Sequence, residues 1–337
     1  MPEPSLSIVV PVLNAREHIG GTIEAAIAAV ERACSLAAEI VVVDDGSTDG
    51  SAAVAKEACS GRLPLRVVSQ PNRGRFEARR AGLAAARGEW TLLLDSRILI
   101  REDALAFAAK RIARGERVWT SHVEVAAGRN PYGTFWKLLA ELAWEDYFSH
   151  PRTVSFGAAD FDRYPKGTTC FLAPRRLLAD AVNAFHSRYD DLRHANDDTP
   201  LLRWIAERES IHISPRFSCV YAPRDRLSSF IRHSRHRGLV FLDGHGRPES
   251  RFFPAVVAFY PVSALLAGAA LRRPWLAAAG LTGVGAAAGV LGVKRGRSPF
   301  EVATLAAVTP VYALAHGAGM WQGLALLARQ RIRGGAG

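Results

Sequence analysis

The chain has 337 residues, of which 49% are hydrophobic and 22% charged, and its formal net charge is +11. This length suits one large domain with an appendage, or two modest domains. The positive excess indicates an anionic partner, and the lack of helix-turn-helix, zinc-finger and RNP-like patterns argues against nucleic acid. Lys and Arg gather between Arg216 and Arg251, directly before an apolar region, which favours anionic lipid headgroups or a diphosphate substrate.

The first 125 residues alternate between short apolar runs and stretches with helical spacing. Strands are predicted at Leu6–Leu13, Glu39–Val43, Leu65–Val68, Trp90–Leu94 and Arg117–Val125. Helices are predicted at Ala15–Cys34, Ser51–Cys59, Arg75–Arg87 and Glu102–Arg114. This alternation predicts an α/β fold with a parallel, doubly wound sheet. Ligands of such sheets bind beyond the carboxyl ends of the strands, which is where Asp44, Asp45 and Asp95 stand.

The middle of the chain gives a weaker pattern. Asn130–Tyr189 is rich in aromatic and turn residues and predicts no definite element. A helix is predicted at Asn196–Glu209, which opens with Asp197 and Asp198, and a basic helix at Ser228–Gly238.

Three apolar stretches follow, at Phe252–Leu271, Trp275–Val293 and Val302–Leu327. Each reaches the roughly 20 residues that cross a bilayer core, and a buried helical core is the alternative. We expect the front of the chain in the cytoplasm, because Met1–Ser7 lacks a signal-peptide pattern. Three full spans would then put the C-terminal arginines outside, against the positive-inside rule. We therefore expect two or three spans, with Phe252–Leu271 as the candidate for a re-entrant or interfacial helix.

Two motifs near the start carry a family resemblance. They are Ser7–Asn14 (SIVVPVLN) and Ile40–Asp49 (IVVVDDGSTD). Together they resemble glycosyltransferase family 2 over roughly Leu6–Gly238. The resemblance implies a GT-A fold at 1–238, with a Rossmann-like nucleotide-binding half at 1–125 and an acceptor half at 126–238. The apolar stretches would form a membrane domain at 252–328.

The resemblance implies an inverting glycosyltransferase of the cell envelope, anchored in the cell membrane with its catalytic domain in the cytoplasm. Its donor would be a nucleotide-diphosphate sugar. Its acceptor would be a lipid-linked saccharide, a polyprenyl phosphate or a glycolipid beside the bilayer. Two alternatives are a nucleotidyltransferase and a catalytically degenerate protein that only binds nucleotide sugar.

The first motif pair supplies the residues expected at the nucleotide. A carboxylate at a strand end accepts hydrogen bonds from the base or the ribose, and this role falls to Asp45. Asp44 would support the turn, and Pro11 would shape the loop against the base. The alternative is a plain turn followed by a helix N-cap, which the same residues permit.

A second segment, Gln70–Gly74, resembles the family's N-x-G stretch, which opens a helix near the nucleotide. Gly74 would allow the backbone to approach the donor closely. Arg75 or Arg79 would contact phosphate at the helix N-terminus; an ordinary loop and helix start is the alternative for each.

Asp95 and Arg97 mark a departure from the family pattern. Family members usually carry Asp-x-Asp here, and the second carboxylate helps to bind Mg2+ or Mn2+ on the diphosphate; this chain has Arg97 in its place. Hard divalent cations prefer carboxylate oxygens. Either Asp95 still helps to hold Mg2+ or Mn2+, which we favour, or the Arg97 guanidinium contacts the diphosphate directly.

The remaining site residues come from the acceptor half. Asp197-Asp198 resembles the family's Glu-Asp pair, so Asp198 matches the catalytic base that takes the acceptor proton; a helix start that favours acidic residues is the alternative. Asp190 and Asp191 are rivals for the base. Gly167–Phe171, which contains Thr169, resembles the stretch that lines the acceptor pocket; a turn into a strand is the alternative. Arg235, in the basic helix, would hold the leaving diphosphate or a lipid phosphate, or the helix would only anchor the chain as a basic face beside the membrane.

Overall fold

The computed structural model describes residues 5–33 and 36–334 and groups them into two compact units. The first unit comprises the residues up to Ala126, Trp144–His186 and Asp197–Ala222. The second comprises Ala127–Ala143, Ser187–Asn196 and the residues from Pro223 onward. The domain limits predicted from the sequence, 1–238 and 252–328, stay a prediction.

Within the described residues, one mixed sheet of nine strands forms the centre of the first unit. The strands are β1 (Leu6–Val12), β2 (Ala38–Asp44), β3 (Leu65–Ser69), β4 (Trp90–Leu94), β5 (Ile98–Ile100), β6 (Val118–Val125), β7 (Val154–Phe156), β8 (Cys170–Pro174) and β9 (Ile211–Tyr221). Eight of them lie in the order β3-β2-β1-β4-β8-β6-β9-β5, and β7 pairs with β9.

The predicted parallel arrangement holds for the first four strands and for the β6–β9 pair, and it is wrong for β5, β7 and β8, which pair antiparallel with their neighbours. β1 runs parallel to β2 and β4, and β2 runs parallel to β3. β8 runs antiparallel to both β4 and β6. A parallel pair needs a crossover between its strands, and β8 instead returns from the irregular middle of the chain, where the apolar residues follow no regular period.

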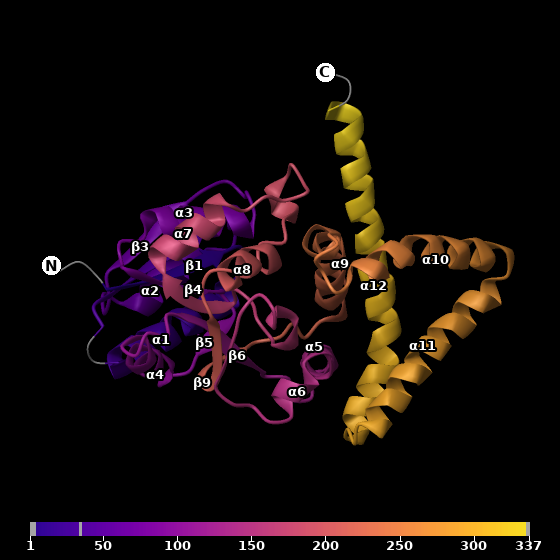
Figure 1. The fold of residues 1–337 in the computed structure, drawn as a ribbon, viewed down its shortest axis with the longest axis horizontal. Helices are drawn as coiled ribbons and strands as arrows, with labels where there is room; N and C mark the ends of the chain where they lie inside the picture. The colour runs from indigo at the N-terminus through magenta and orange to yellow at the C-terminus, as the bar shows by residue number, and fades with distance from the viewer. Residues whose placement is uncertain (1–4, 34–35, 335–337) are drawn as a thin grey trace. The chain divides into compact units, whose positions relative to one another are not determined.

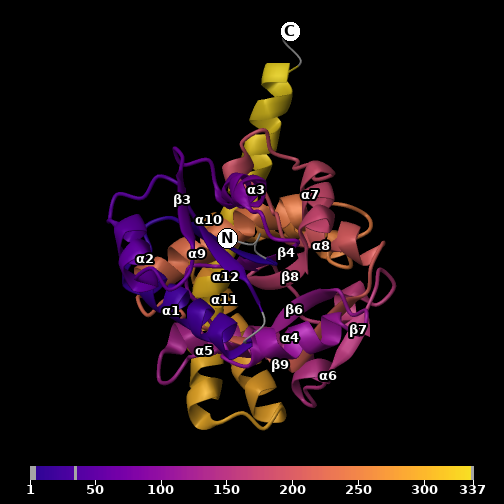
Figure 2. The same ribbon diagram turned by 90° about the vertical axis from the view of Figure 1, so that its left-hand side faces the viewer.

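Helices cover both faces of this sheet. The helices of the first unit are α1 (Arg16–Ala33), α2 (Ser51–Cys59), α3 (Arg75–Ala85), α4 (Ala104–Ile112), α6 (Glu145–Phe148), α7 (Arg175–Asn183) and α8 (Thr199–Ala206), with a 3-10 turn η1 (Phe161–Arg163). Figures 1 and 2 show α1 and α4 on one face and α3 and α7 on the other. The five helices predicted in this unit are present; the first ends at Ala33, and Cys34 lies outside the described residues.

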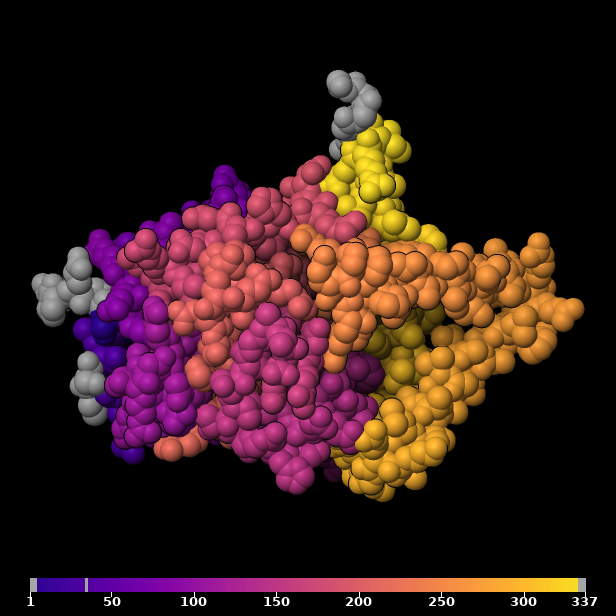
Figure 3. All heavy atoms as spheres, viewed as in Figure 1, coloured from indigo at the N-terminus to yellow at the C-terminus, as the bar shows by residue number. Residues whose placement is uncertain are grey.

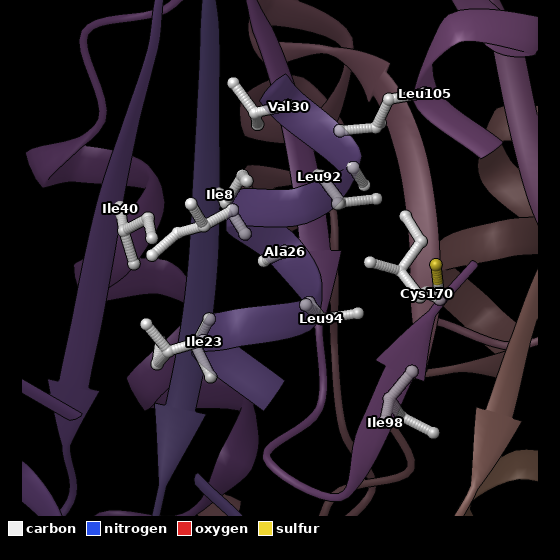
Figure 4. Packing of buried hydrophobic residues seen from close by; sticks show 14 of the residues in the cluster. Ile8, Ile23, Ala26, Val30, Ile40, Leu92, Leu94, Ile98, Leu105 and Cys170 are labelled. Carbon is white, nitrogen blue, oxygen red and sulfur yellow. The ribbon is translucent and has the colours of Figure 1, made fainter. Parts of the chain in front are cut away.

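The main core lies between the sheet and α1 (Figure 4). Alternate strand residues such as Ile8, Ile40 and Leu92 point toward Ile23 and Ala26 of the helix, and all are fully buried. A side chain of this kind contributes about 1.5–3 kcal/mol when it leaves water, so this layer supplies much of the stability of the unit.

The opposite face of the sheet seats α3 unusually closely. Gly82 lies directly over β1 and β2, and a Cβ at this position would overlap the Val9 Cγ1 methyl and lie 3.1 Å from Val43 Cγ2. The missing side chain therefore sets the height of α3 above the strands. Arg79, one turn earlier on the helix, is positioned by the same contact.

The second unit is helical. Its elements are α5 (Pro131–Ala143), η2 (Leu192–His194), α9 (Leu227–His245), α10 (Phe253–Arg272), α11 (Pro274–Lys294) and α12 (Pro299–Gly334). By length and composition α10, α11 and α12 are each able to cross a membrane, with mean hydropathies of 1.8, 1.8 and 1.3 over their most apolar windows. The three predicted apolar stretches are thus confirmed as helices.

We expect Gly82→Ala to destabilise the protein by about 1–3 kcal/mol, because the added methyl overpacks a filled interface. Val9→Ala in the same chain removes the overlapping methyl, so the double variant should lose less than the sum of the single losses. Thermal unfolding of the detergent-purified protein measures both effects. Gly280→Ala in α11 is the matched control, because a Cβ there meets nothing within 4 Å; an equal loss in that variant contradicts the prediction.

Candidate functional site

Acidic residues gather where β2 and β4 end, on either side of β1. Asp44 closes β2 and Asp45 follows it, with the Asp45 N–H donating to the Val12 carbonyl at 2.9 Å. Asp95 follows β4 and donates its N–H to the Thr169 carbonyl at 2.8 Å. Because β2, β1 and β4 are parallel neighbours, these residues lie along one edge of the sheet.

The Asp45 carboxylate is buried and bound by the segment before α3. Its Oδ1 accepts hydrogen bonds from Gln70 Nε2 at 2.7 Å and from the Arg73 N–H at 2.8 Å. Its Oδ2 accepts from the Gly74 N–H at 2.9 Å. Gly74 is the N-cap of α3 and has a φ of 91°, a backbone conformation that favours glycine. Asp45 therefore fixes the start of α3 in place.

Asp44 has a different environment. It is half-buried, and its Oδ1 accepts the Ser47 N–H at 2.9 Å within the turn after β2. The same turn is tied to the end of β1, because the Asn14 Oδ1 accepts the Thr48 N–H at 2.9 Å. Pro11 is buried within β1, opposite Val43 of β2. The two predicted nucleotide-side motifs are thus joined by direct hydrogen bonds.

Arg79 of α3 brings together Asp95 and the Asp197-Asp198 pair, which are far apart in the sequence. Its Nη2 donates to Asp95 Oδ1 at 2.8 Å. Its Nη1 donates to Asp197 Oδ2 in a very short contact and lies 3.4 Å from Asp198 Oδ1. The guanidinium is 3% exposed. We call Arg79, Asp95, Asp197 and Asp198 the arginine cluster.

The electrostatics of the cluster depend on this one cation. Burial disfavours the charge on Arg79, but the carboxylates of Asp197, Asp95 and Asp198 outweigh it and raise its pKa. Burial raises the pKa of Asp197, and Arg79 opposes that shift. Arg75 lies one turn earlier on α3 and is exposed; desolvation beside the cluster opposes its charge, but Asp95 and Asp197 raise its pKa. Both predicted phosphate-side arginines therefore lie in the field of the cluster.

The two acidic residues before α8 are not equivalent. The Asp197 side chain is 7% exposed and is held by Arg79, whereas the Asp198 side chain is 39% exposed. Asp198 Oδ1 also accepts a very short hydrogen bond from Thr168 Oγ1. Asp198 is therefore the carboxylate of the pair that reaches solvent while being held in place.

Thr168 is the residue that sequence reasoning missed. The predicted acceptor residue, Thr169, meets the Asp95 N–H through its backbone carbonyl, while its neighbour Thr168 contacts Asp198. The Gly-Thr-Thr stretch marked the correct place in the sequence. The identity of the contacting threonine depends on which side chain faces α8, and composition does not reveal that.

Other predicted residues are held elsewhere. Arg97 is half-buried in the connection from β4 to β5, where its carbonyl accepts the Ala222 N–H at 3.1 Å. Arg235 belongs to α9 of the second unit and donates from Nε to Gln322 at 3.0 Å. Asp191, a rival for the base, is bound by the Arg193 guanidinium at 2.7 Å and caps η2.

The donor set near Asp95 does not fit a divalent cation held by the protein alone. Among the described residues, no three His, Cys, Asp or Glu side chains are arranged to hold a metal ion. Asp95 Oδ1 faces a guanidinium, and Arg97 occupies the position of the expected second carboxylate. A hard cation needs several oxygen ligands, which this pair does not supply.

Part of the sequence and the fold match known proteins. The model of the glycosyl transferase family 2 matches residues 7–169. A solved structure of the mannosyltransferase PcManGT from Pyrobaculum calidifontis, in complex with GDP-Man and Mn2+, is similar over 95% of this chain and 87% of that chain. Its identity is 21% and its TM-score 0.55, and this likeness confirms the predicted GT-A fold.

Two curated relatives match the front of the chain. The succinoglycan biosynthesis protein ExoO of Rhizobium meliloti (strain 1021) is 34% identical over 125 residues, which are 37% of this chain and 34% of the relative. The dolichyl-phosphate beta-glucosyltransferase of Mus musculus is 34% identical over 102 residues, which are 28% of this chain and 32% of the relative. The matches thus span about a third of each relative. Residues 7–169 carry a family 2 glycosyltransferase domain.

We expect Arg79→Gln to destabilise the protein by about 3–5 kcal/mol, because it leaves three carboxylates without their shared cation. Arg79→Lys should recover only part of this loss, since an ammonium cannot bridge the same oxygens in a fixed plane. Arg101→Gln is the control: the Arg101 and Glu124 side chains are 53% and 43% exposed, and this surface pair should contribute at most about 1 kcal/mol. Unfolding of the purified variants measures the differences.

The Arg79→Gln deficit should also depend on pH. Without Arg79, the pKa of Asp197 rises further above its ordinary value of 3.8. When the pKa of a carboxyl is higher in the folded protein than in the unfolded chain, the free energy of unfolding falls as the pH rises from the unfolded-state pKa to the folded-state pKa. The gap in unfolding temperature between Arg79→Gln and the unaltered chain should therefore widen from acidic to neutral pH. A gap that narrows over this range contradicts the assignment.

Proposed function

We propose that the chain is an inverting glycosyltransferase that moves a sugar from a nucleotide-diphosphate donor to a membrane-associated acceptor. The observation that carries this proposal is the arginine cluster. It ties Asp95, at a strand end on the donor side, to Asp198, at the start of an acceptor-side helix. The family 2 domain supports the reaction class, and the names of its relatives support sugar transfer.

On the donor side, we infer that Asp44 rather than Asp45 contacts the nucleoside. Asp45 is buried and already accepts three hydrogen bonds from the segment that ends at Gly74, so its task is to hold that segment. Asp44 is half-buried at the same strand end. Pro11 and Gly74 complete the wall beside the nucleotide, and Arg75 and Arg97 supply positive charge for the diphosphate.

On the acceptor side, Asp198 acts as the general base. Its carboxylate takes the proton of an acceptor hydroxyl while the hydroxyl oxygen attacks the anomeric carbon. The bond from that carbon to the diphosphate breaks on the opposite face, so the configuration inverts and a nucleoside diphosphate leaves. The Thr168 hydroxyl and Arg79 hold Asp198 in position. A phosphate acceptor is already anionic and would need this base much less.

The chain's own apolar helices support an acceptor that lies at the bilayer. Three C-terminal helices are candidate spans, which suits a lipid-linked saccharide, a polyprenyl phosphate or a glycolipid. One relative is by name a dolichyl-phosphate glucosyltransferase, which supports a lipid-phosphate acceptor as one of these classes. Arg232 and Arg235 are exposed on α9, which directly precedes these helices in the sequence, and their charges suit anionic headgroups. We place the catalytic domain in the cytoplasm, where sugar nucleotides are available.

The test is a donor screen on membranes that contain the protein, with a lipid extract as acceptor. We expect one sugar nucleotide to release nucleoside diphosphate and to label a lipid-extractable product. Release of pyrophosphate instead would favour a nucleotidyltransferase. Binding of sugar nucleotide without turnover on any acceptor would favour a degenerate protein.

Asp198→Asn should lower the turnover of a hydroxyl acceptor by about 10²–10⁴-fold, because the variant cannot take the proton. The amide keeps an oxygen that can accept from Thr168, so the fold should survive. Asp191→Asn is the control, since Asp191 is bound to Arg193, and it should leave turnover unchanged. Nucleoside diphosphate release under saturating donor measures both variants. Full turnover in Asp198→Asn with a hydroxyl acceptor would refute the role of the base.

Chelation tests the role of metal. The sequence favours Mg2+ or Mn2+ with Asp95 as ligand, but the donor set described above does not fit a cation held by the protein alone, so we expect most transfer activity to persist in EDTA. Arg97→Asp restores the family's Asp-x-Asp pattern and should make transfer sensitive to EDTA. Loss of wild-type activity in EDTA, with recovery on adding Mn2+, would restore the original cofactor prediction.

A further inference from the structure

We propose that α10 and α11 cross the membrane as a hairpin, and that α12, although apolar, does not cross but lies along the membrane surface on the same side as both ends of the hairpin. The occupant of the exposed α10–α11 surface is bilayer hydrocarbon. This inference rests on the proposed membrane association, not on the identity of donor or acceptor. All the contacts that carry it lie within the second unit.

The first observation is that α5, through ion pairs, and the basic helix α9 hold α12 along its length. At its start, Glu301 pairs with Lys137 of α5 at 3.3 Å, and Arg297, just before it, pairs with Glu141 of α5 at 2.5 Å. Further along, Gly319 lies against the backbone of α9 at Arg235. From position 301 to 319 the helix rises about 27 Å, close to the whole thickness of a bilayer core. Ion pairs and a basic helix along that distance do not suit hydrocarbon.

The second observation is the length and burial of the three helices. α12 has 36 residues and would be about 54 Å long, well beyond a single span. α10 and α11 have 20 and 21 residues, about 30 Å each, which matches the bilayer core. Over their most apolar windows, 28% of α12 is buried by protein, against 6% of α10 and 17% of α11. The two shorter helices therefore present the surface that lacks a protein partner.

The third observation is how the hairpin is attached. The Trp321 indole N–H donates to Ser263 Oγ at 3.1 Å, and Gly317 faces the Phe259 ring, so α10 leaves α12 near these residues. α11 returns to a different part of α12, where a Cβ placed at Gly289 would lie 3.3 Å from the Ala306 Cβ. Figure 1 shows the two helices meeting at a point away from α12, and Figure 3 shows them projecting from it.

The exposed apolar side chains are concentrated on this hairpin. Of the large apolar side chains that are more than half exposed, most lie on α10 and α11: Val257, Val262, Leu265, Leu266, Leu271, Trp275, Val290 and Val293. A monomer in water rarely presents such a surface, and lipid is the partner that covers it without a complementary protein.

The charges agree with the same arrangement. The tip of the hairpin carries Arg272 and Arg273 beside Trp275, a combination typical of the membrane–water interface. When α12 lies on the same side of the membrane as both ends of the hairpin, the other basic residues that flank these helices all lie on that side: Arg247, Arg251, Lys294, Arg295, Arg297, Arg329 and Arg331. This satisfies the positive-inside rule, which three full spans would violate.

The experiment labels single introduced cysteines with a membrane-impermeant maleimide in sealed vesicles that enclose the first unit. Arg273→Cys, Lys294→Cys and Ala328→Cys report the hairpin tip, the α11–α12 connection and the end of α12. Glu57→Cys on α2 marks the enclosed side, and the unsubstituted chain controls for native cysteines, of which Cys59, Cys170 and Cys219 are buried. Labelling is repeated after the vesicles are permeabilised.

We expect Arg273→Cys to be labelled in sealed vesicles, and Lys294→Cys and Ala328→Cys only after permeabilisation. Labelling of Ala328→Cys in sealed vesicles would overturn the proposal, because α12 would then cross. Labelling of Lys294→Cys with protection of Arg273→Cys would also overturn it, because α11 and α12 would then be the spans. Protection of all three would mean that no helix crosses. Extraction of the chain by a carbonate wash would refute membrane insertion itself. If the extracted protein still transferred sugar, the proposed reaction would stand although the membrane topology did not.

Discussion

One buried guanidinium holds the candidate site together. Arg79 contacts Asp95, Asp197 and Asp198, and it lies almost wholly out of water. Carboxylates this close repel one another strongly when they are shielded from solvent, and a single cation between them converts repulsion into attraction. The arrangement is costly to break because removal of the cation leaves buried charge without compensation. The positions of the donor-side and acceptor-side acids are therefore set by one side chain.

Two features of α3 deliver that side chain. Asp45 fixes the start of the helix through the Gly74 N–H, and Gly82 lets the helix lie close to β1 and β2. Position 79 stands between these anchors, about 7.5 Å along the helix axis from Gly74. Asp45, in the turn after β2, thus positions the start of α3. α3 in turn positions the Arg79 guanidinium.

Much of the first unit was readable from the sequence. Continuous β-branched runs such as Ile40–Val43 are typical of strands buried on both faces, so the first four strands and their parallel order followed from the pattern. The placement of Asp44 and Asp95 at strand ends followed from the same rule. The antiparallel β8 did not, because the chain between β6 and β8 has no regular period and its direction of return is a tertiary property.

The arginine cluster was not readable in the same way. Arg79 and Asp197 are 118 positions apart, and the sequence around either residue does not indicate that it pairs with the other. The sequence suggested phosphate for Arg79, and the structure surrounds its guanidinium with carboxylates. The apolar C-terminal helices show a similar limit: length and hydropathy identified all three, but the ion pairs that hold the start of α12 to α5 depend on packing.

The most direct test of the account is a double-mutant cycle between Arg79 and Asp198, measured as nucleoside diphosphate release by the unaltered chain, Arg79→Gln, Asp198→Asn and the double variant, each at a temperature where it is folded. If Arg79 acts through Asp198, the double variant turns over no more slowly than Asp198→Asn alone. If the two fold-losses in turnover multiply instead, Arg79 and Asp198 act independently. The account, in which Arg79 positions Asp198, would then be contradicted.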